Sequence, residues 1–128
     1  MELNWVKKQG TGGKPMLTDV RFNIDKQERV QITFSASAVN TKFNGAKHLV
    51  FAISGSRVYF KEEDSKYGYT VSRPDNTRAG LLQVTSKELA DFLHKNSHFR
   101  EANLRYDSQM GLYFVDASKR DLDWKENR

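Results

Sequence analysis

Alternating apolar and polar residues mark two strands near the start of the chain. Val20, Phe22 and Ile24 alternate with polar residues, and the same alternation resumes at residues 30–34 after a polar turn. A period of two is typical of strands that bury one face. The two runs therefore predict an antiparallel hairpin.

The spacing of apolar residues changes after this hairpin. Ala36, Val39 and Phe43 are three and four residues apart, which fits one or two helical turns capped by Ser35 and ended by Asn44-Gly45. Beyond this short helix, two strands are expected at residues 48–53 and 57–61. The intervening Ser54-Gly55-Ser56 favours a tight hairpin turn between them.

The second half of the chain repeats this sequence of elements. After a strand at 67–72 and a connector at 73–80, residues 81–84 are expected to form another strand. Thr85 and Glu88 have the spacing of a capping box, and Leu89, Phe92 and Leu93 then form one apolar helix face. A last hairpin is expected from strands at 103–107 and 112–116.

Residues 29–63 and 81–117 therefore present the same order of elements twice, which predicts an internal duplication. The alternative is that any two strand-helix-hairpin segments share these periodicities. The matched positions are Val30 with Leu82, Gln31 with Gln83, Ile32 with Val84, Thr33 with Thr85, Phe43 with Leu93, Leu49 with Leu104, Phe51 with Tyr106, and Tyr59-Phe60 with Tyr113-Phe114.

The expected fold is a single α+β domain of mainly antiparallel strands, built from two similar strand-helix-hairpin units. The domain is expected to span residues 18–118, with units at about 18–72 and 80–117. Residues 1–17 are expected to form a flexible arm because of their glycine content, and residues 119–128 a charged tail.

Composition narrows the possible classes of protein. The chain of 128 residues has no cysteine, which excludes disulfides, thiolate catalysis and cysteine zinc sites. No segment approaches the roughly 20 apolar residues of a membrane span. We therefore expect a cytoplasmic protein without a membrane partner.

Charge is distributed unevenly along the chain, whose formal net charge is +5. Residues 1–61 contain ten Lys or Arg against four Asp or Glu, whereas residues 62–128 contain eleven against twelve. A positive excess favours anionic partners such as nucleic acid. Ordinary solvated lysines are the alternative explanation.

The turn of the first hairpin resembles the motif of the AbrB-type swapped-hairpin DNA-binding family, approximately L-D-x-x-G-R-V-x-I-P. The matching residues are Ile24, Asp25, Arg29, Val30 and Ile32, whereas Glu28 replaces the glycine and Thr33 the proline. In the second unit, Gly80 matches the glycine, and Leu81 replaces the arginine.

This arrangement is similar to that of the two-unit MraZ proteins. The resemblance implies duplex DNA binding in a regulatory role, by a monomeric pseudo-dimer or a homo-oligomer.

Binding of nucleic acid requires cations on an exposed face near strand or hairpin ends. The alternative is that the turn cations are solvated residues paired with Asp25 and Glu28. The candidate binding residues in the body are Arg21, Lys26, Arg29, Lys42 and Lys47, and those in the arm are Lys7, Lys8 and Lys14.

Aromatic residues in the hairpins offer a second possible contact with nucleic acid. Alternation predicts that Tyr59 and Tyr113 lie on the face opposite to Phe60 and Phe114, so that one tyrosine of each unit is exposed. An exposed tyrosine can stack on an unpaired base. Packing within the core or between strands is the competing use of these side chains.

Signals for catalysis or metal binding are weak. His94 and His98 are four residues apart, but Asn96 and Ser97 indicate that the helix ends between them, and no third ligand has a recognisable spacing. We therefore predict a protein that is not an enzyme and holds no cofactor or metal. A hydrolase with an unfamiliar site is the third possibility.

The predicted function is binding of nucleic acid, namely duplex DNA in a regulatory setting. The alternative is a non-catalytic protein-interaction module from a mobile element or accessory system, which would bind a protein partner through an exposed sheet face.

Overall fold

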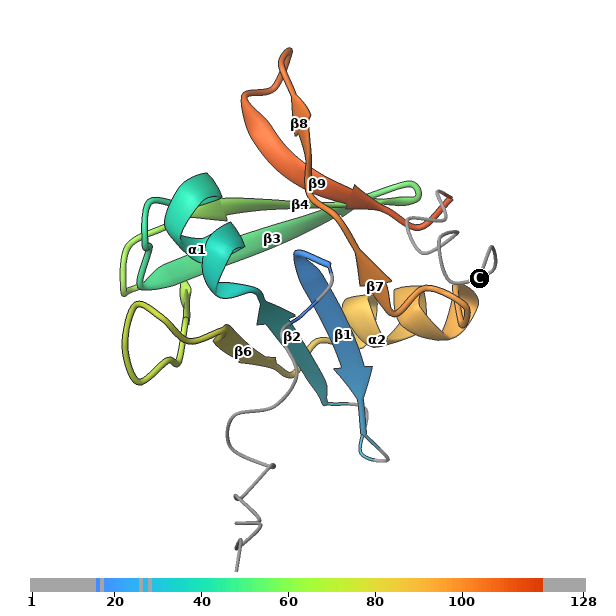
Figure 1. Ribbon diagram of the computed structural model, residues 1–128. Helices are drawn as coiled ribbons and strands as arrows, with labels where there is room; N and C mark the ends of the chain where they lie inside the picture. Colours follow the sequence, from blue (N-terminus) through green and yellow to red (C-terminus); the bar gives the residue numbers. More distant parts are fainter. Residues whose placement is uncertain (1–15, 17, 26, 28, 119–128) are drawn as a thin grey trace, which may run out of the picture.

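The computed structural model describes residues 16, 18–25, 27 and 29–118. Over these residues the chain forms nine strands and two helices, and the strands make two antiparallel sheets with the core between them (Figure 1). The α+β prediction with mainly antiparallel strands is confirmed. In this described part, neither helix is long and apolar enough to cross a membrane.

The first sheet has the strand order β6-β2-β1-β7. Its strands are β6 (Gly80–Val84), β2 (Val30–Phe34), β1 (Val20–Ile24) and β7 (Glu101–Ala102). The predicted first hairpin is the β1–β2 pair. Alternate residues of these strands are buried, as the period of two requires.

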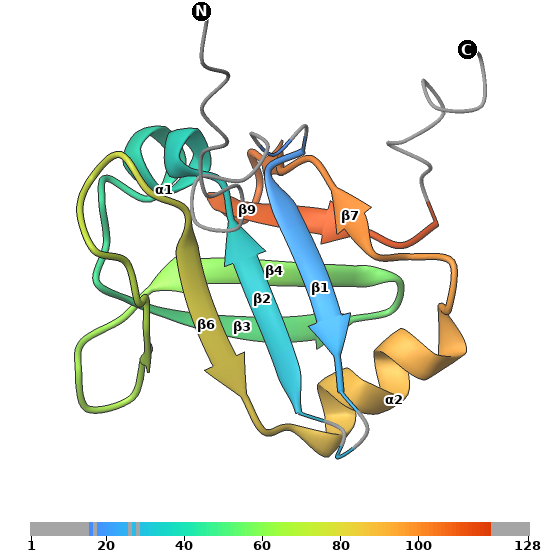
Figure 2. The ribbon, with the colours of Figure 1, turned by 60° about the horizontal axis from the view of Figure 1, so that its bottom comes forward.

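The second sheet has the strand order β5-β3-β4-β9-β8. Its strands are β5 (Tyr69–Thr70), β3 (His48–Ser54), β4 (Arg57–Glu62), β9 (Leu112–Asp116) and β8 (Arg105–Asp107). The two predicted hairpins are β3–β4 and β8–β9. Figure 2 shows the first sheet in front, with its strands crossing those of β3 and β4 behind.

The helices α1 (Ala36–Lys42) and α2 (Lys87–Lys95) lie at opposite ends of the first sheet (Figure 2). The Ser35 side chain accepts a hydrogen bond from the Ala38 backbone N–H, as expected for the cap of α1. The predicted capping box of α2 is wrong by one residue. Ser86, and not Thr85, caps α2, because its hydroxyl is the acceptor for the Leu89 N–H.

Aromatic side chains join the two sheets to α1. The ring of Phe34, which has no solvent exposure, lies 5.0 Å from Phe60 of β4 and 5.5 Å from Phe43 after α1. On the α2 side, Phe99 lies 5.4 Å from Phe22 and 6.2 Å from Phe92. Each helix region therefore covers one end of the core.

The strand predicted at residues 67–72 is shorter than expected, because the chain passes from one sheet to the other there. Only Tyr69–Thr70 pairs with β3, and Ser72 pairs with Leu81 of the first sheet. Gly80 allows this close approach. A Cβ atom on Gly80 would lie 2.5 Å from Cγ1 of Val71.

The pairing of strands from the two halves follows an approximate two-fold pattern. In the β2–β6 pair, Gln31 lies opposite Gln83, and the flanking pairs are Val30 with Val84 and Ile32 with Leu82. The second sheet has the matching order β3-β4-β9-β8 at its centre and far edge. The β2–β6 and β4–β9 pairs therefore each follow a local two-fold relation, but β1 and β7 lie beyond β2 with no counterpart beyond β6, which is an edge strand. The internal duplication stays a prediction.

The predicted equivalence of Tyr59 with Tyr113 is wrong. Tyr59 lies opposite Phe114, and Phe60 lies opposite Tyr113. Directly opposed residues share a face of the sheet, so a two-fold relation must pair a tyrosine with a phenylalanine here. Tyr59 is only 8% exposed and packs on Phe114, whereas Tyr113 packs against Phe43 on the core side.

Candidate nucleic-acid interface

The outer face of the first sheet carries mostly polar side chains. These are the residues that alternate with the buried ones on β1, β2 and β6. The outer face consists of Arg21, Asn23, Gln31, Thr33, Leu81 and Gln83, with Asp25, Arg29 and Thr85 at the end where β2 begins and β6 finishes.

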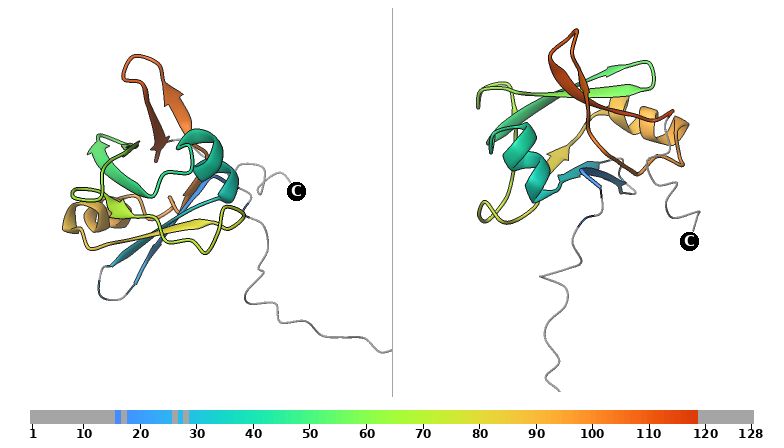
Figure 3. Two further views of the ribbon diagram at one scale, coloured as in Figure 1. Left: turned by 90° about the vertical axis from the view of Figure 1, so that its left-hand side faces the viewer. Right: turned by 45° about the horizontal axis from the view of Figure 1, so that its top comes forward.

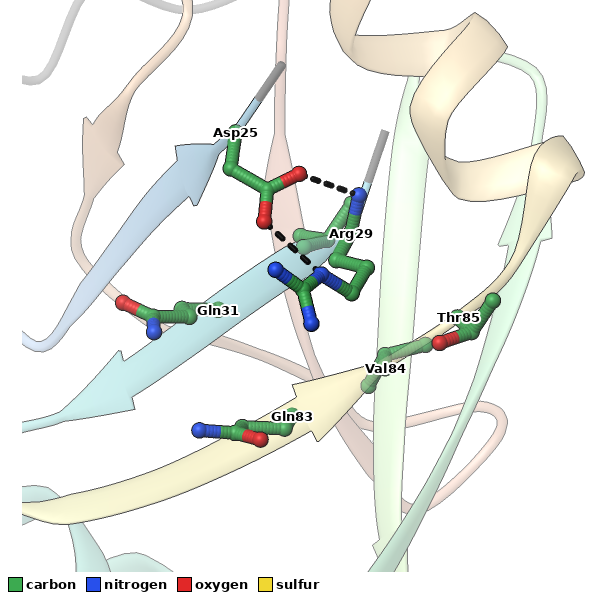
Figure 4. Close-up of a pocket in the computed structure, with 7 residues that line it drawn as sticks. Asp25, Arg29, Gln31, Gln83, Val84 and Thr85 are labelled. Carbon is green, nitrogen blue, oxygen red and sulfur yellow. Dashed lines mark hydrogen bonds and ion pairs between the residues drawn. The ribbon is translucent and has the colours of Figure 1, made fainter. Parts of the chain in front are cut away.

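A pocket of about 140 Å³ opens at this end of the outer face. Figure 4 shows that its polar residues come from the β1–β2 turn and from the adjoining strands β2 and β6. The pocket is lined by Asp25, Arg29, Val30, Gln31, Gln83, Val84 and Thr85.

Asp25 fixes the backbone of the turn and the side chain of Arg29. Its Oδ1 accepts hydrogen bonds from the backbone N–H groups of Gln27 and Arg29, at 2.8 and 2.9 Å. Its Oδ2 accepts a further bond from Arg29 Nε at 2.9 Å. The backbone N–H of Arg29, followed by the other donors in this turn, lowers the pKa of Asp25 below its usual value.

The predicted alternative, in which Arg29 pairs with Asp25, is thus what the structure contains. The pairing uses only Nε of the guanidinium. Both terminal nitrogens of Arg29 have no protein partner among the described residues. Figure 4 shows the guanidinium extending from β2 toward β6, across the pocket. The carboxylate therefore orients the arginine without occupying its outer edge.

Gln31 and Gln83 lie beside Arg29 on the same face. They are directly opposite one another on β2 and β6, and both are exposed. Within the described part of the chain, their amide groups have no hydrogen-bond partner. Each amide offers two donors and an acceptor to a ligand.

Arg21 lies on the outer face but has an acidic partner. Its Nη2 atom is 3.4 Å from Oε1 of Glu101, an atom that also accepts a bond from the Thr18 hydroxyl at 3.1 Å. The ion pair between Arg21 and Glu101 therefore links β1 to β7. Because Arg29 also has a carboxylate partner, the outer face combines balanced charges with unengaged amides and is not a strongly basic surface.

The four predicted cations that the structure describes do not gather on one face. Arg21 and Arg29 lie on the first sheet, whereas Lys42 is the last residue of α1 and Lys47 lies between α1 and β3. The length of β2 separates both lysines from Arg29. The Lys42 Nζ atom lies 5.3 Å from the centre of the Tyr113 ring. Lys47 is exposed just before β3. Lys26, Lys7, Lys8 and Lys14 lie outside the described residues.

Sequence reasoning missed Gln31, Gln83 and Thr85 as members of the site. One feature of the sequence could have identified the glutamines: they occupy matched positions of the two units, on the polar side of each predicted strand. The pairing between β2 and β6 was the missing information, because it joins residues more than 50 positions apart.

The histidine pair does not form a metal site. The helix α2 ends at Lys95, and His98 lies beyond it, with Nε2 at 3.1 Å from the carbonyl oxygen of Ala117. The expectation that the helix ends between the histidines is confirmed. Across the described residues, no group of three His, Asp or Glu side chains is placed to hold a metal ion.

A second cluster of charged side chains connects the strands β4, β8 and β9. Arg57 lies 3.6 Å from Asp107 and 3.5 Å from Asp116, and its guanidinium carbon lies 4.2 Å from the centre of the Phe114 ring. Tyr59 receives a bond from Arg57 at 3.0 Å and donates one to Asp107 at 3.1 Å. Every member of the cluster has a protein partner, so we assign the cluster a structural role.

No protein-family model, curated protein or solved structure matches the chain. The resemblance to the AbrB-type family therefore rests on the residues of the β1–β2 turn and on the order of elements that follows it.

Proposed function

We propose that the protein binds duplex DNA through the outer face of its first sheet, in a regulatory role. One observation carries this proposal. Arg29, oriented by Asp25, presents its terminal nitrogens beside the unengaged amides of Gln31 and Gln83. Arginine and glutamine are side chains that read base edges through paired hydrogen bonds.

The shape of the site fits the same ligand. The major groove of B-DNA is about 12 Å wide and admits a two-stranded antiparallel ribbon. The strands β2 and β6 form an antiparallel pair at one edge of the four-stranded sheet, and their outward side chains are polar except for Leu81. The Asp25 carboxylate reduces the freedom that Arg29 would lose on binding, because it already holds the guanidinium in place.

The resemblance of the β1–β2 turn to the AbrB-type motif supports the proposal from the sequence. Asp25 and Arg29, which match that motif, are the two residues that the structure joins at the edge of the pocket. On this reading, a single chain supplies both halves of the strand arrangement as a pseudo-dimer.

Attraction to the phosphate backbone must come from other cations, because Arg21 and Arg29 have acidic partners. We assign this role to lysines outside the described residues, where the sequence has an excess of positive charge. They are Lys7, Lys8, Lys14 and Lys26.

A protein-interaction module is the second candidate, and a different surface favours it. The β8–β9 hairpin forms one edge of the second sheet, and its turn projects away from the rest of the molecule (Figure 3). Tyr106 and Met110 on this hairpin are 57% and 58% exposed. Tyrosine and methionine are enriched at protein interfaces. Under this alternative, the hairpin and not the first sheet contacts the partner.

Reversal of the charge at Arg29 should weaken binding of duplex DNA by at least about tenfold, because a carboxylate would then face the bases and phosphates. The measurement is fluorescence anisotropy with a labelled duplex of mixed sequence at low salt. Arg29→Glu lies in an exposed turn, so circular dichroism should show an unchanged fold.

The matched control is Lys61→Glu, which changes the net charge equally on an exposed position of β4 in the other sheet. It should leave most of the affinity intact. Neutralising Lys7, Lys8 and Lys14 together should flatten the dependence of log affinity on log salt by about two to three units, at roughly 0.9 per phosphate contact. Equal losses from Arg29→Glu and Lys61→Glu, or no binding by the wild type, would contradict the proposal.

A further inference from the structure

The arrangement of Gln31 and Gln83 matches the local symmetry of a DNA duplex. The two side chains face each other across antiparallel strands, at the centre of the approximate two-fold pattern. A step of two base pairs also has a two-fold axis, which exchanges its strands. Two glutamines related in this way would meet equivalent bases on opposite strands.

The spacing between Arg29, which immediately precedes β2, and Gln31 places Arg29 over a different base pair. Arg29 and Gln31 are two residues apart on one face, which corresponds to about 6.7 Å along a strand. Successive bases of one DNA strand are about 3.4 Å apart along the helix axis. Arg29 therefore lies about two base pairs from the step contacted by the glutamines.

The two units differ at this flanking position. Two residues before Gln83, at the place that corresponds to Arg29, the chain has Leu81. Leu81 is half-buried and has no polar group on its side chain. Of these two corresponding positions, Arg29 can contact a guanine and Leu81 cannot.

We infer that the protein reads a central step with one adenine on each strand, flanked on one side by a guanine about two base pairs away. Gln31 and Gln83 each pair with the N6 and N7 edge of an adenine, and the terminal nitrogens of Arg29 pair with O6 and N7 of the guanine. This inference rests on the proposed function and adds the base sequence that the site recognises.

Selection from a duplex library with a randomised centre tests the inference. The wild-type protein should enrich AT or TA at the central step and guanine on one side of it. An enriched sequence should bind about tenfold or more tightly than a duplex with G·C pairs at the central step.

Substitutions at the three positions should change different parts of the enriched sequence. The double variant Gln31→Ala, Gln83→Ala should lose the preference at the central step and keep the flanking guanine. Arg29→Lys should lose the guanine and keep the central step, because lysine retains the charge but not the planar fork. Gln109→Ala, a glutamine exposed in the β8–β9 turn, is the matched control and should select as the wild type does.

The inference and the proposed function fail in different ways. Binding of duplex DNA by the wild type without enrichment of any base would overturn the inference and leave the proposed function standing. Enrichment that survives the double glutamine variant would overturn it as well. Absence of duplex binding at low salt would overturn both.

Discussion

Replacement of Phe34 by alanine is expected to lower the free energy of unfolding by about 3–5 kcal/mol. Phe34 ends β2, has no solvent exposure, and contacts Phe43 and Phe60 edge-on. Its removal leaves a cavity where the first sheet, the second sheet and α1 meet. The two neighbouring rings, Phe60 of β4 and Phe43 after α1, belong to a close-packed core and cannot move inward far enough to fill it.

Urea unfolding, monitored by far-ultraviolet circular dichroism, measures this loss of stability. The control is Tyr67→Ala, because Tyr67 is also aromatic but 65% exposed, and it should change stability by no more than about 0.5 kcal/mol. A loss below about 1 kcal/mol for Phe34→Ala would place the centre of the core elsewhere.

Replacement of Asp116 by alanine is expected to cost on the order of 2 kcal/mol at neutral pH. Asp116 is 5% exposed, and its Oδ1 accepts bonds from the Ser56 hydroxyl, the Ser118 hydroxyl and the Ser118 backbone N–H. Its Oδ2 lies 3.5 Å from Arg57. Alanine leaves these donors without their charged acceptor.

The loss should depend on pH. Burial alone would raise the pKa of Asp116, but the hydrogen bonds from Ser118 and Ser56 and the charge of Arg57 outweigh it and lower the pKa below the usual 3.8. A carboxylate with a lowered pKa in the folded state adds stability above its unfolded pKa. That contribution disappears as the pH falls through the folded value.

Thermal unfolding of the wild type and Asp116→Ala across a pH series separates this contribution from general acid sensitivity. The difference between the two proteins should be largest above pH 4 to 5, about one unit above the usual carboxyl pKa, and should narrow at lower pH. Asp91→Ala removes a carboxylate from an exposed pair with Lys87 and should show little difference at any pH. A difference that stays constant with pH would mean that the charge of Asp116 contributes nothing.

Local elements of the fold were predictable because their signals lie within a few residues. Ser35 caps α1, Asn44 and Gly45 end that region with positive φ, and the β3–β4 turn lies at Gly55. Each of these features depends on backbone chemistry at one position. The error at Thr85 arose because two adjacent hydroxyl residues precede α2, and sequence spacing does not decide which one reaches the helix N–H.

Pairing between distant strands was not predictable in the same way. The face that Tyr113 adopts depends on its partner across β4 and β9, which is Phe60. Alternation fixes only that neighbours within a strand point to opposite sides. It does not determine which side faces the core. Tyr59 and Tyr113 were therefore assigned to the same face of the sheet, although they lie on opposite faces.

The candidate site was predictable in part. Arg29 and Asp25 were visible because they are four residues apart in one turn. The acidic partner of Arg21 was hidden, since Glu101 follows 80 positions later and reaches Arg21 only through the β1–β7 pairing. Net charge along the chain therefore overstated the positive character of the first sheet.

The most direct test of the central claim is a titration of the ¹⁵N-labelled protein with duplex DNA, followed by two-dimensional NMR. We expect the side-chain signals of Arg29 Nε, Gln31 and Gln83 to shift together, while the signals of the β8–β9 hairpin stay in place. Shifts confined to Tyr106, Met110 and their neighbours, or no shifts at all, would contradict binding through the outer face of the first sheet.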